Sequence, residues 1–432
     1  MIFVRYLIVL LFLVSCATPS EIKSSEVKRV LTTLSSDEMQ GRQPFTPGIS
    51  KAADFISKEF ELIGLKPLEG LSSYRQTFTV NSLSIKASKV VINETLLPGQ
   101  DYFMKLSSST LNWSEDNRPE VKFIKDLDNF REKAGEAFRS TTDMLVMVNP
   151  THKETFNRYR SYFSRSKLQL PEESQTNGAN IVFVLIKDTE IKSLSIEVTV
   201  EKEEKELYNI VGKIEGKRKN EIVLYSAHYD HLGIGSLVEG DSIYNGANDD
   251  ASGVTAVIEL AQYFKRKGVP ERTLIFTAFT AEEIGGYGSR YFSQQLDPDE
   301  IVAMLNIEMI GKPSKEGLNS AWMTGWDKSN LGEILQKNLA KVDYKFFADP
   351  YPDQNLFYRS DNATLAKLGV PAHSISTTQI DIDKNYHQMS DEIETLDIEN
   401  ITNTIMAIAI GSQGIIDGKQ TPSRVNPEEV ND

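Results

Sequence analysis

Short apolar runs alternate with helix-like segments in the second half of the chain. The first of these runs is too short for a helix, and we interpret it and its counterparts as buried strands. Between two of the runs, apolar residues recur at the helical spacing of Val254, Val257, Ile258 and Ala261. This alternation predicts an α/β fold in which a mostly parallel or mixed sheet is flanked by helices. The predicted strands are 222–225, 274–279, 301–308 and 371–377.

The first half of the chain divides into two parts. Residues 52–60 have a helical pattern, and Gly64 followed by Pro67 predicts that this helix ends there. About residues 85–200 instead carry strand-like runs at 144–148 and 180–186 between polar connections, and that length suffices for a small domain. We therefore expect one large domain from residues 26–80 and 205–416, an inserted smaller α+β domain at 85–200, and a polar C-terminal tail at 417–432.

Polar residues that bind metals follow the predicted strands. In open α/β sheets, ligands gather outside the carboxyl ends of the strands, so these side chains are expected to meet at one edge of the sheet. The candidates are His228, Asp249, Glu282, Glu283, Glu308 and His387.

Imidazole and carboxylate groups together form a mixed N/O set that suits Zn²⁺, with Co²⁺ or Mn²⁺ as possible replacements. A pair of ions about 3.5–4 Å apart needs a bridging carboxylate, and one further carboxylate has to stay off the metals to move protons. Adjacent Glu282 and Glu283 answer both needs, because neighbouring side chains diverge. Asp230 is placed to accept the ring N–H of His228, and Tyr386 to donate a hydrogen bond to a developing oxyanion.

Several motifs resemble those of the zinc aminopeptidases of peptidase family M28 in clan MH. They are AHYDHLG (227–233), GANDDASG (246–253), AEE (281–283), LNIEMIG (305–311) and YH (386–387), together with LSSDEMQGR (34–42). The resemblance covers about residues 26–80 and 205–415. It implies the phosphorylase/hydrolase-like fold of zinc peptidases, and it implies that the insertion at 85–200 is a lid or apical domain.

The same resemblance assigns roles to the candidate residues. It makes Asp249 the bridging ligand, His228 and Glu308 the ligands of one zinc ion, and Glu283 and His387 those of the other. It implies hydrolysis of the N-terminal peptide bond of peptides with a free N-terminus, by a metal-bridging water that Glu282 activates. Two positions depart from the family pattern: Glu308 stands where Asp is commoner, and Asn362 stands after Asp361 where many relatives have His.

The N-terminus resembles a bacterial lipoprotein signal. Arg5 precedes the apolar residues 7–14, which are too few to span a membrane. Leu13-Val14-Ser15-Cys16 resembles a lipobox, so residues 1–15 are expected to be a signal peptide, Cys16 to be lipidated and residues 16–25 to be a tether. The protein is then exported to the cell envelope and anchored to a membrane through Cys16. In a Gram-negative host, Ala17 in place of Asp favours a location at the outer membrane or in the periplasm.

The net charge of −14 disfavours nucleic-acid binding, since no basic stripe offsets it. Two other readings of the motifs remain open. Glutaminyl-peptide cyclases resemble this family and normally use one zinc, and some relatives have lost their ligands and act as binding proteins. Dipeptidase or carboxypeptidase specificity needs a cation for the substrate carboxylate, for which Arg359 and Lys384 are the candidates. His231 and His373 are further candidates for the pocket lining.

Overall fold

The computed structural model describes residues 21–430 except 165, 176–177, 188–189 and 239. The expected signal peptide and Cys16 lie outside the described residues. The chain forms two compact units, which we call the large unit (Met1–Gln76 with Tyr208–Asp432) and the small unit (Thr77–Leu207). Within the described part of the chain, no helix is both long enough and apolar enough to cross a membrane.

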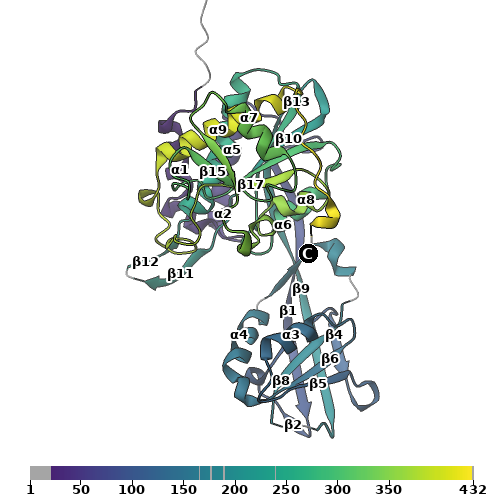
Figure 1. Cartoon of the computed structure of the whole chain (residues 1–432). Helices are drawn as coiled ribbons and strands as arrows, with labels where there is room; N and C mark the ends of the chain where they lie inside the picture. The colour runs from purple at the N-terminus through teal and green to yellow at the C-terminus, as the bar shows by residue number, and fades with distance from the viewer. Residues whose placement is uncertain (1–20, 165, 176–177, 188–189, 239, 431–432) are drawn as a thin grey trace, which may run out of the picture. The chain divides into compact units, whose positions relative to one another are not determined.

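The large unit is built on a mixed sheet with the strand order β16-β15-β17-β14-β10-β13-β9 (Figure 1). Strands β17, β14, β10 and β13 are parallel, and β9 and β15 join them in antiparallel fashion. This sheet confirms the predicted α/β fold. The strand bounds are β9 Leu194–Ile214, β10 Arg218–His228, β13 Arg272–Phe279, β14 Ile301–Ile307, β15 Ser320–Met323, β16 Lys345–Ala348 and β17 Ala372–Ser376.

Helices cover both faces of this sheet. Alternate strand residues such as Val223 and Tyr225 pack in one core cluster with α1, α2, α5, α7 and α9. The residues between them, such as Leu224, pack in a second cluster with α6 and α8. Because both faces are buried, the central strands carry continuous apolar runs in the sequence. The helix bounds are α1 Ser24–Leu34, α2 Pro47–Ile63, α5 Ser252–Arg266, α6 Tyr287–Ser293, α7 Leu331–Asn338, α8 Asn362–Ala366 and α9 Ile398–Ile416.

The two ends of the described chain belong to the large unit. Helix α2 ends at Ile63, and Gly64 follows in the left-handed conformation with φ 78°, which confirms the predicted helix stop. Residues expected to form a polar C-terminal tail also contribute to the core, since Val425 and Val430 are buried in the second cluster. A hairpin of β11 (Gly233–Val238) and β12 (Asp241–Tyr244) separates β10 from α5.

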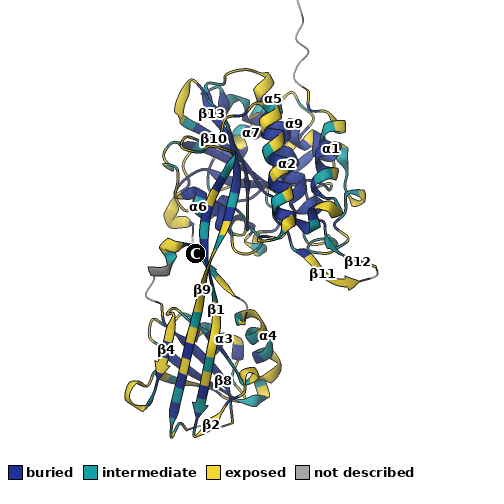
Figure 2. Cartoon of the chain, turned by 180° about the vertical axis from the view of Figure 1, so that it is seen from behind, coloured by how far each residue is buried: buried dark blue, intermediate teal, exposed yellow. Residues whose placement is uncertain are grey.

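The small unit contains a sheet with the order β3-β8-β6-β5. One face packs under α3 and α4 through an aromatic cluster that includes Phe103, Phe156 and Phe183. The other face packs against β1, β4 and β9 (Figure 2). Trp113 is buried in the core between them. The bounds are β1 Arg75–Ile92, β2 Thr95–Leu96, β3 Tyr102–Lys105, β4 Thr110–Trp113, β5 Glu120–Ile124, α3 Phe130–Phe138, β6 Met144–Val148, α4 Lys153–Phe163, β7 Lys167–Gln169 and β8 Ile181–Leu185.

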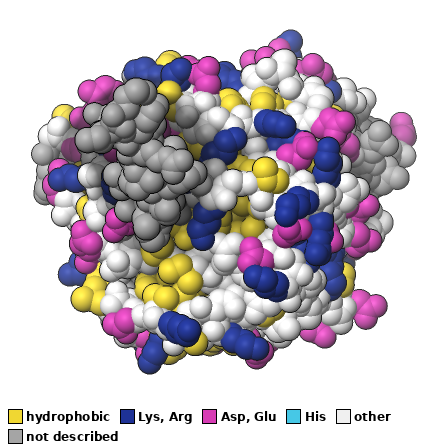
Figure 3. Space-filling model, turned by 90° about the horizontal axis from the view of Figure 1, so that it is seen from above, with side chains coloured by type: hydrophobic (Ala, Val, Ile, Leu, Met, Phe, Trp, Pro, Cys, Tyr) yellow, Lys and Arg dark blue, Asp and Glu magenta, His cyan; other side chains and the backbone are white. Residues whose placement is uncertain are grey.

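Charged side chains of both signs are mixed over the described part of the face shown in Figure 3. Such a mixture lacks the single-sign stripe that characterises nucleic-acid-binding surfaces.

Candidate metal centre

The strand register brings the candidate ligands to one edge of the large unit's sheet. His228 is the last residue of β10 and pairs with Phe279 of β13, while Ser226 pairs with Asn306 of β14. The three strands therefore end level with one another, so that Glu282 and Glu308 follow directly beyond them. Asp249 lies just before α5, and His387 lies in the loop between β17 and α9. All six predicted residues line one pocket.

Asp249 lies between two imidazoles. Its Oδ1 is 3.1 Å from His228 Nε2, and its Oδ2 is 3.2 Å from His387 Nε2. Each imidazole also faces a second carboxylate, at 3.5 Å from Glu308 Oε2 for His228 and 3.2 Å from Glu283 Oε2 for His387. These convergent N and O atoms form a donor set that suits divalent metals such as zinc. Although burial lowers the pKa of His387, hydrogen bonds to the two carboxylates raise it overall to about 10.

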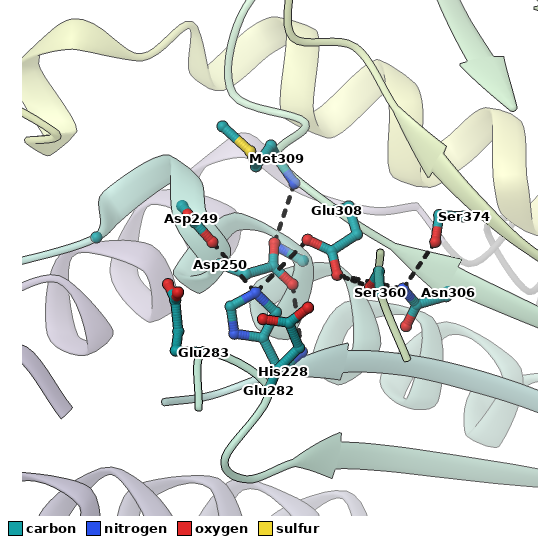
Figure 4. A network of polar contacts seen from close by, with 12 residues as sticks. His228, Asp249, Asp250, Glu282, Glu283, Asn306, Glu308, Met309, Ser360 and Ser374 are labelled. Carbon is teal, nitrogen blue, oxygen red and sulfur yellow. Dashed lines mark hydrogen bonds and ion pairs between the residues drawn. The ribbon is translucent and has the colours of Figure 1, made fainter. Parts of the chain in front are cut away.

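Asp250 joins three segments of the site (Figure 4). Its carboxylate accepts hydrogen bonds from the backbone N–H of His228 at 3.3 Å, of Gly253 at 3.1 Å and of Met309 at 3.1 Å. The carboxylate also lies close to His228 and Glu308, close enough for the three to form a metal-binding group by distance alone. We interpret Asp250 as structural, because its oxygens already serve backbone donors. The peptide bond between Asp249 and Asp250 is cis.

Asp230 supports the site through different atoms from those expected. Its carboxylate accepts the backbone N–H of Glu282 at 3.0 Å and of Glu283 at 3.3 Å. The ring Nδ1 of His228 lies 3.1 Å from the backbone oxygen of Asp230 but 3.8 Å from its carboxylate. The expected carboxylate–imidazole contact is therefore replaced by a main-chain contact, because the carboxylate binds the turn after β13. Burial raises the pKa of Asp230 to about 6.

His231 is a site residue whose role the sequence left open. It is 1% exposed, and its Nδ1 lies 2.8 Å from Glu283 Oε1. That contact orients Glu283 toward His387, whose ring meets the His231 ring edge-on. Its sequence signals are the spacing of three residues from His228 and its place in the motif AHYDHLG. Neither His231 nor His373 belongs to the pocket lining for which both were candidates. The His373 ring contacts the backbone oxygen of Thr324 at 2.8 Å and Ser329 Oγ at 2.7 Å.

Glu308 is fixed by hydrogen bonds on the side away from His228. Its Oε1 accepts hydrogen bonds from Ser360 and, at 3.2 Å, from Asn306 Nδ2, which also contacts Ser374 Oγ (Figure 4). The long arm of this glutamate is thereby held at the metal site. Asn362, the second departure from the family pattern, lies outside the pocket lining and bonds the core residues Phe357, Ala372 and Ser374.

Two buried carboxyls near this network have raised pKa values. Burial is the main cause for both Glu282 and Asp361, and neighbouring carboxylates add to it against the opposing effect of His228. The pKa of Asp361 rises to about 7. Neither Asp361 oxygen has a hydrogen-bond partner among the described residues. This concentration of negative charge favours the binding of cations.

The remaining pocket wall combines apolar residues with one cation. Tyr386 stacks on the His387 ring with centroids 4.0 Å apart, and burial raises the pKa of its hydroxyl. The apolar part of the lining is formed by Met309, Trp322, Leu356 and Ile380. Arg359 also lines the pocket, and its guanidinium forms no ion pair or hydrogen bond with another described residue, while its backbone N–H donates to the backbone oxygen of Leu356 at 3.1 Å.

Comparisons with known proteins point to one family. The model of Peptidase family M28 matches residues 209–410. An aminopeptidase of Pseudomonas aeruginosa is 33% identical over 151 residues, which are 33% of this chain and 26% of that protein. This chain thus spans about a quarter of the length of that curated relative.

Two solved structures share the fold at low sequence identity. The aminopeptidase from Aneurinibacillus sp. strain AM-1 has a TM-score of 0.55 at 17% identity, covering 95% of this chain and 97% of its own. A zinc aminopeptidase from Bacillus subtilis has a TM-score of 0.55 at 14% identity, covering 92% and 96%. These likenesses support the mixed α/β fold described above.

Proposed function

Because the chain belongs to peptidase family M28, we propose that it is a metal-dependent aminopeptidase that uses two divalent ions, preferably zinc. The observation that carries this proposal is the position of Asp249, whose two oxygens face His228 and His387 separately. His228, Asp249 and Glu308 would hold one ion, and Asp249, Glu283 and His387 the other. When bound, such a pair polarises a carbonyl group and lowers the pKa of a water molecule.

Glu282 is the proposed general base. It lines the pocket beside both ligand sets. The hydrogen bond from its backbone N–H to the Asp230 carboxylate fixes the position of its backbone at this edge of the sheet. The carboxylate takes a proton from the attacking water and then delivers it to the amine that leaves the cleaved bond. Tyr386, on the same wall, donates a hydrogen bond to the oxygen of the tetrahedral intermediate.

The substrate proposed is a peptide with a free N-terminus. Its amine is attracted by the acidic residues of the pocket, and its first side chain contacts the wall formed by Met309, Trp322, Leu356 and Ile380. An apolar first residue gains most from this wall, because its surface leaves water.

Metal content and product chemistry together test the proposal. The purified chain is subjected to elemental analysis and is assayed with aminoacyl-anilides and with N-terminal-Gln peptides, before and after chelation. Two ions per chain with chelator-sensitive aniline release support an aminopeptidase. One ion per chain with pyroglutamate formation would show that the protein is a glutaminyl-peptide cyclase instead. Absence of both metal and turnover would indicate a binding protein without catalytic activity.

We also propose that the protein is exported and anchored through a lipid on Cys16. The support is the resemblance of residues 13–16 to a lipobox. Cell fractionation tests this: Cys16→Ala should move the protein out of the membrane fraction, whereas Ser15→Ala, which keeps the acceptor thiol, should leave it there. An unchanged distribution of Cys16→Ala would exclude the anchor.

A further inference from the structure

Arg42 is a buried cation that contacts only backbone oxygens. It is 1% exposed, and it follows α1 in the segment Asp37–Arg42. Its guanidinium donates to the backbone oxygens of Leu34 at 2.7 Å, Tyr229 at 2.9 Å, Asn245 at 2.6 Å and Gly246 at 2.9 Å. Each of its three nitrogens is therefore used in a hydrogen bond.

Three of these contacts fall on the segments that carry candidate metal ligands. Tyr229 directly follows His228, and Asn245 and Gly246 lie four and three residues before Asp249. A further bond runs from the backbone N–H of His231 to the backbone oxygen of Arg42, at 3.3 Å. One side chain from the N-terminal segment thus sets the distance between the end of β10 and the loop before α5.

An arginine is suited to this place in geometry and in charge. Its planar group presents five N–H donors in a fixed fork, which a lysine cannot reproduce with one compact ammonium. Burying a cation is costly without compensating charge. The compensation comes from the carboxylates of Asp249, Asp391, Asp230 and Asp250, which act on Arg42 through space. The site's negative charge and this buried positive charge therefore stabilise each other.

We propose that Arg42 is a positioning residue of the metal centre, which holds the His228 and Asp249 segments at the separation that a metal pair requires. The inference rests on the proposed metal-dependent function. It adds a residue that lies 186 positions before His228 and 207 positions before Asp249 in the sequence. Its role is exerted through the backbone, and it contacts neither the metals nor the substrate.

Metal retention of the Arg42→Lys variant tests this role. The full-length protein in mild detergent is dialysed against zinc buffered by a chelator at graded concentrations, and bound zinc is measured by elemental analysis. Retention should weaken by roughly 10–100-fold, the usual effect of residues that orient metal ligands. Excess zinc should restore part of kcat, and KM should change less than kcat.

Arg272 provides a matched control. It is 3% exposed and also donates to backbone oxygens, those of Ile415 at 2.8 Å and Gln420 at 2.7 Å, but it begins β13 at the end remote from Glu282. Arg272→Lys should lower thermal stability without changing zinc retention. If both variants retain zinc as the wild type does, Arg42 has only a structural role and the inference is overturned. A wild-type chain without zinc would overturn the proposed function as well.

Hydrogen exchange of the wild-type protein tests the same inference without a variant, should Arg42→Lys fail to fold. Removing the metal should speed amide exchange in residues 35–46 together with residues 228–231 and 245–250. Residues 415–421, which contact Arg272, should exchange at an unchanged rate. If metal removal leaves the exchange rate of residues 35–46 unchanged, the inference that Arg42 positions the metal centre is overturned.

Discussion

The two halves of the candidate metal centre differ in how firmly they are held. The inner half, His228 with Glu308, lies at strand ends, and the side chain of His228 is 2% exposed. The outer half, Glu283 with His387, includes a loop residue whose side chain is 35% exposed. Glu308 is fixed by Asn306 and Ser360, whereas His387 contacts the two carboxylates and the ring of Tyr386.

If two metals bind as proposed, this difference predicts that they exchange at unequal rates. A ligand at the end of a buried strand moves only when the sheet deforms, whereas a loop ligand moves through local opening at lower free energy. We therefore expect the outer ion to be lost and replaced first. Asp249, which is shared, would remain with the inner ion.

Replacing Glu282 by Gln should give the largest effect, a loss of turnover. It should leave metal binding by the inner and outer halves of the metal centre equally unaffected. Because Glu282 is proposed to move protons and not to bind metal, kcat should fall by about 10²–10⁴-fold with unchanged zinc content. Steady-state kinetics and elemental analysis on the same preparation check this. Glu333→Gln, on the exposed face of α7, is the control. Unchanged turnover, or loss of zinc, would remove Glu282 from its assigned role.

Replacing His387 by Ala separates the halves directly. The wild type should release zinc to a chelator in two steps, and the variant should retain only the slower one, because the inner set of His228, Glu308 and Asp249 is intact. Stopped-flow measurements with a chromogenic chelator resolve the steps. His228→Ala should instead abolish the slow step. A single release step in the wild type, or loss of both ions from His387→Ala, would contradict the comparison.

The fold and the convergence of the ligands could be predicted from local patterns in the sequence. Apolar runs predicted the parallel strands, because buried strands must be apolar on both faces, and His228 and Glu308 were recognisable beyond their ends. Contacts between distant segments left no such pattern. The sequence could not show that Asp230 binds the backbone of Glu282, that Asp250 joins three segments, or that Arg42 reaches Gly246. Each of these bonds involves a backbone atom, whose position only the folded chain determines.

Acid should weaken the scaffold behind the inner half through His373. Burial lowers the pKa of His373 to about 4, and both ring nitrogens are already bonded. An unfolded histidine titrates near 6.5, so the unfolded state takes up the proton first, and stability present above pH 6.5 is lost as pH falls toward 4. The loss is about 3 kcal/mol at most.

Urea titrations at pH 7, 6 and 5 measure this dependence. His373→Gln should flatten the decline of the unfolding free energy between pH 6.5 and 4, while His152→Gln in the small unit should not. If the unfolding free energy declines equally steeply in both variants, groups other than His373 cause the decline.

Replacing Arg359 should give the smallest effect, a change in substrate preference without a change in metal binding. It precedes Ser360, which holds Glu308, yet its own guanidinium lines the pocket and pairs with no described residue. A carboxylate just beyond the cleaved bond, as in a dipeptide, would give it a partner. Because the side chain is exposed, Arg359→Gln should lower kcat/KM for a dipeptide relative to its C-terminal amide by only about threefold. Zinc content should stay unchanged. Lys384→Gln is the control, because Lys384, the other candidate cation, does not line the pocket. An unchanged ratio would show that this cation does not select short substrates.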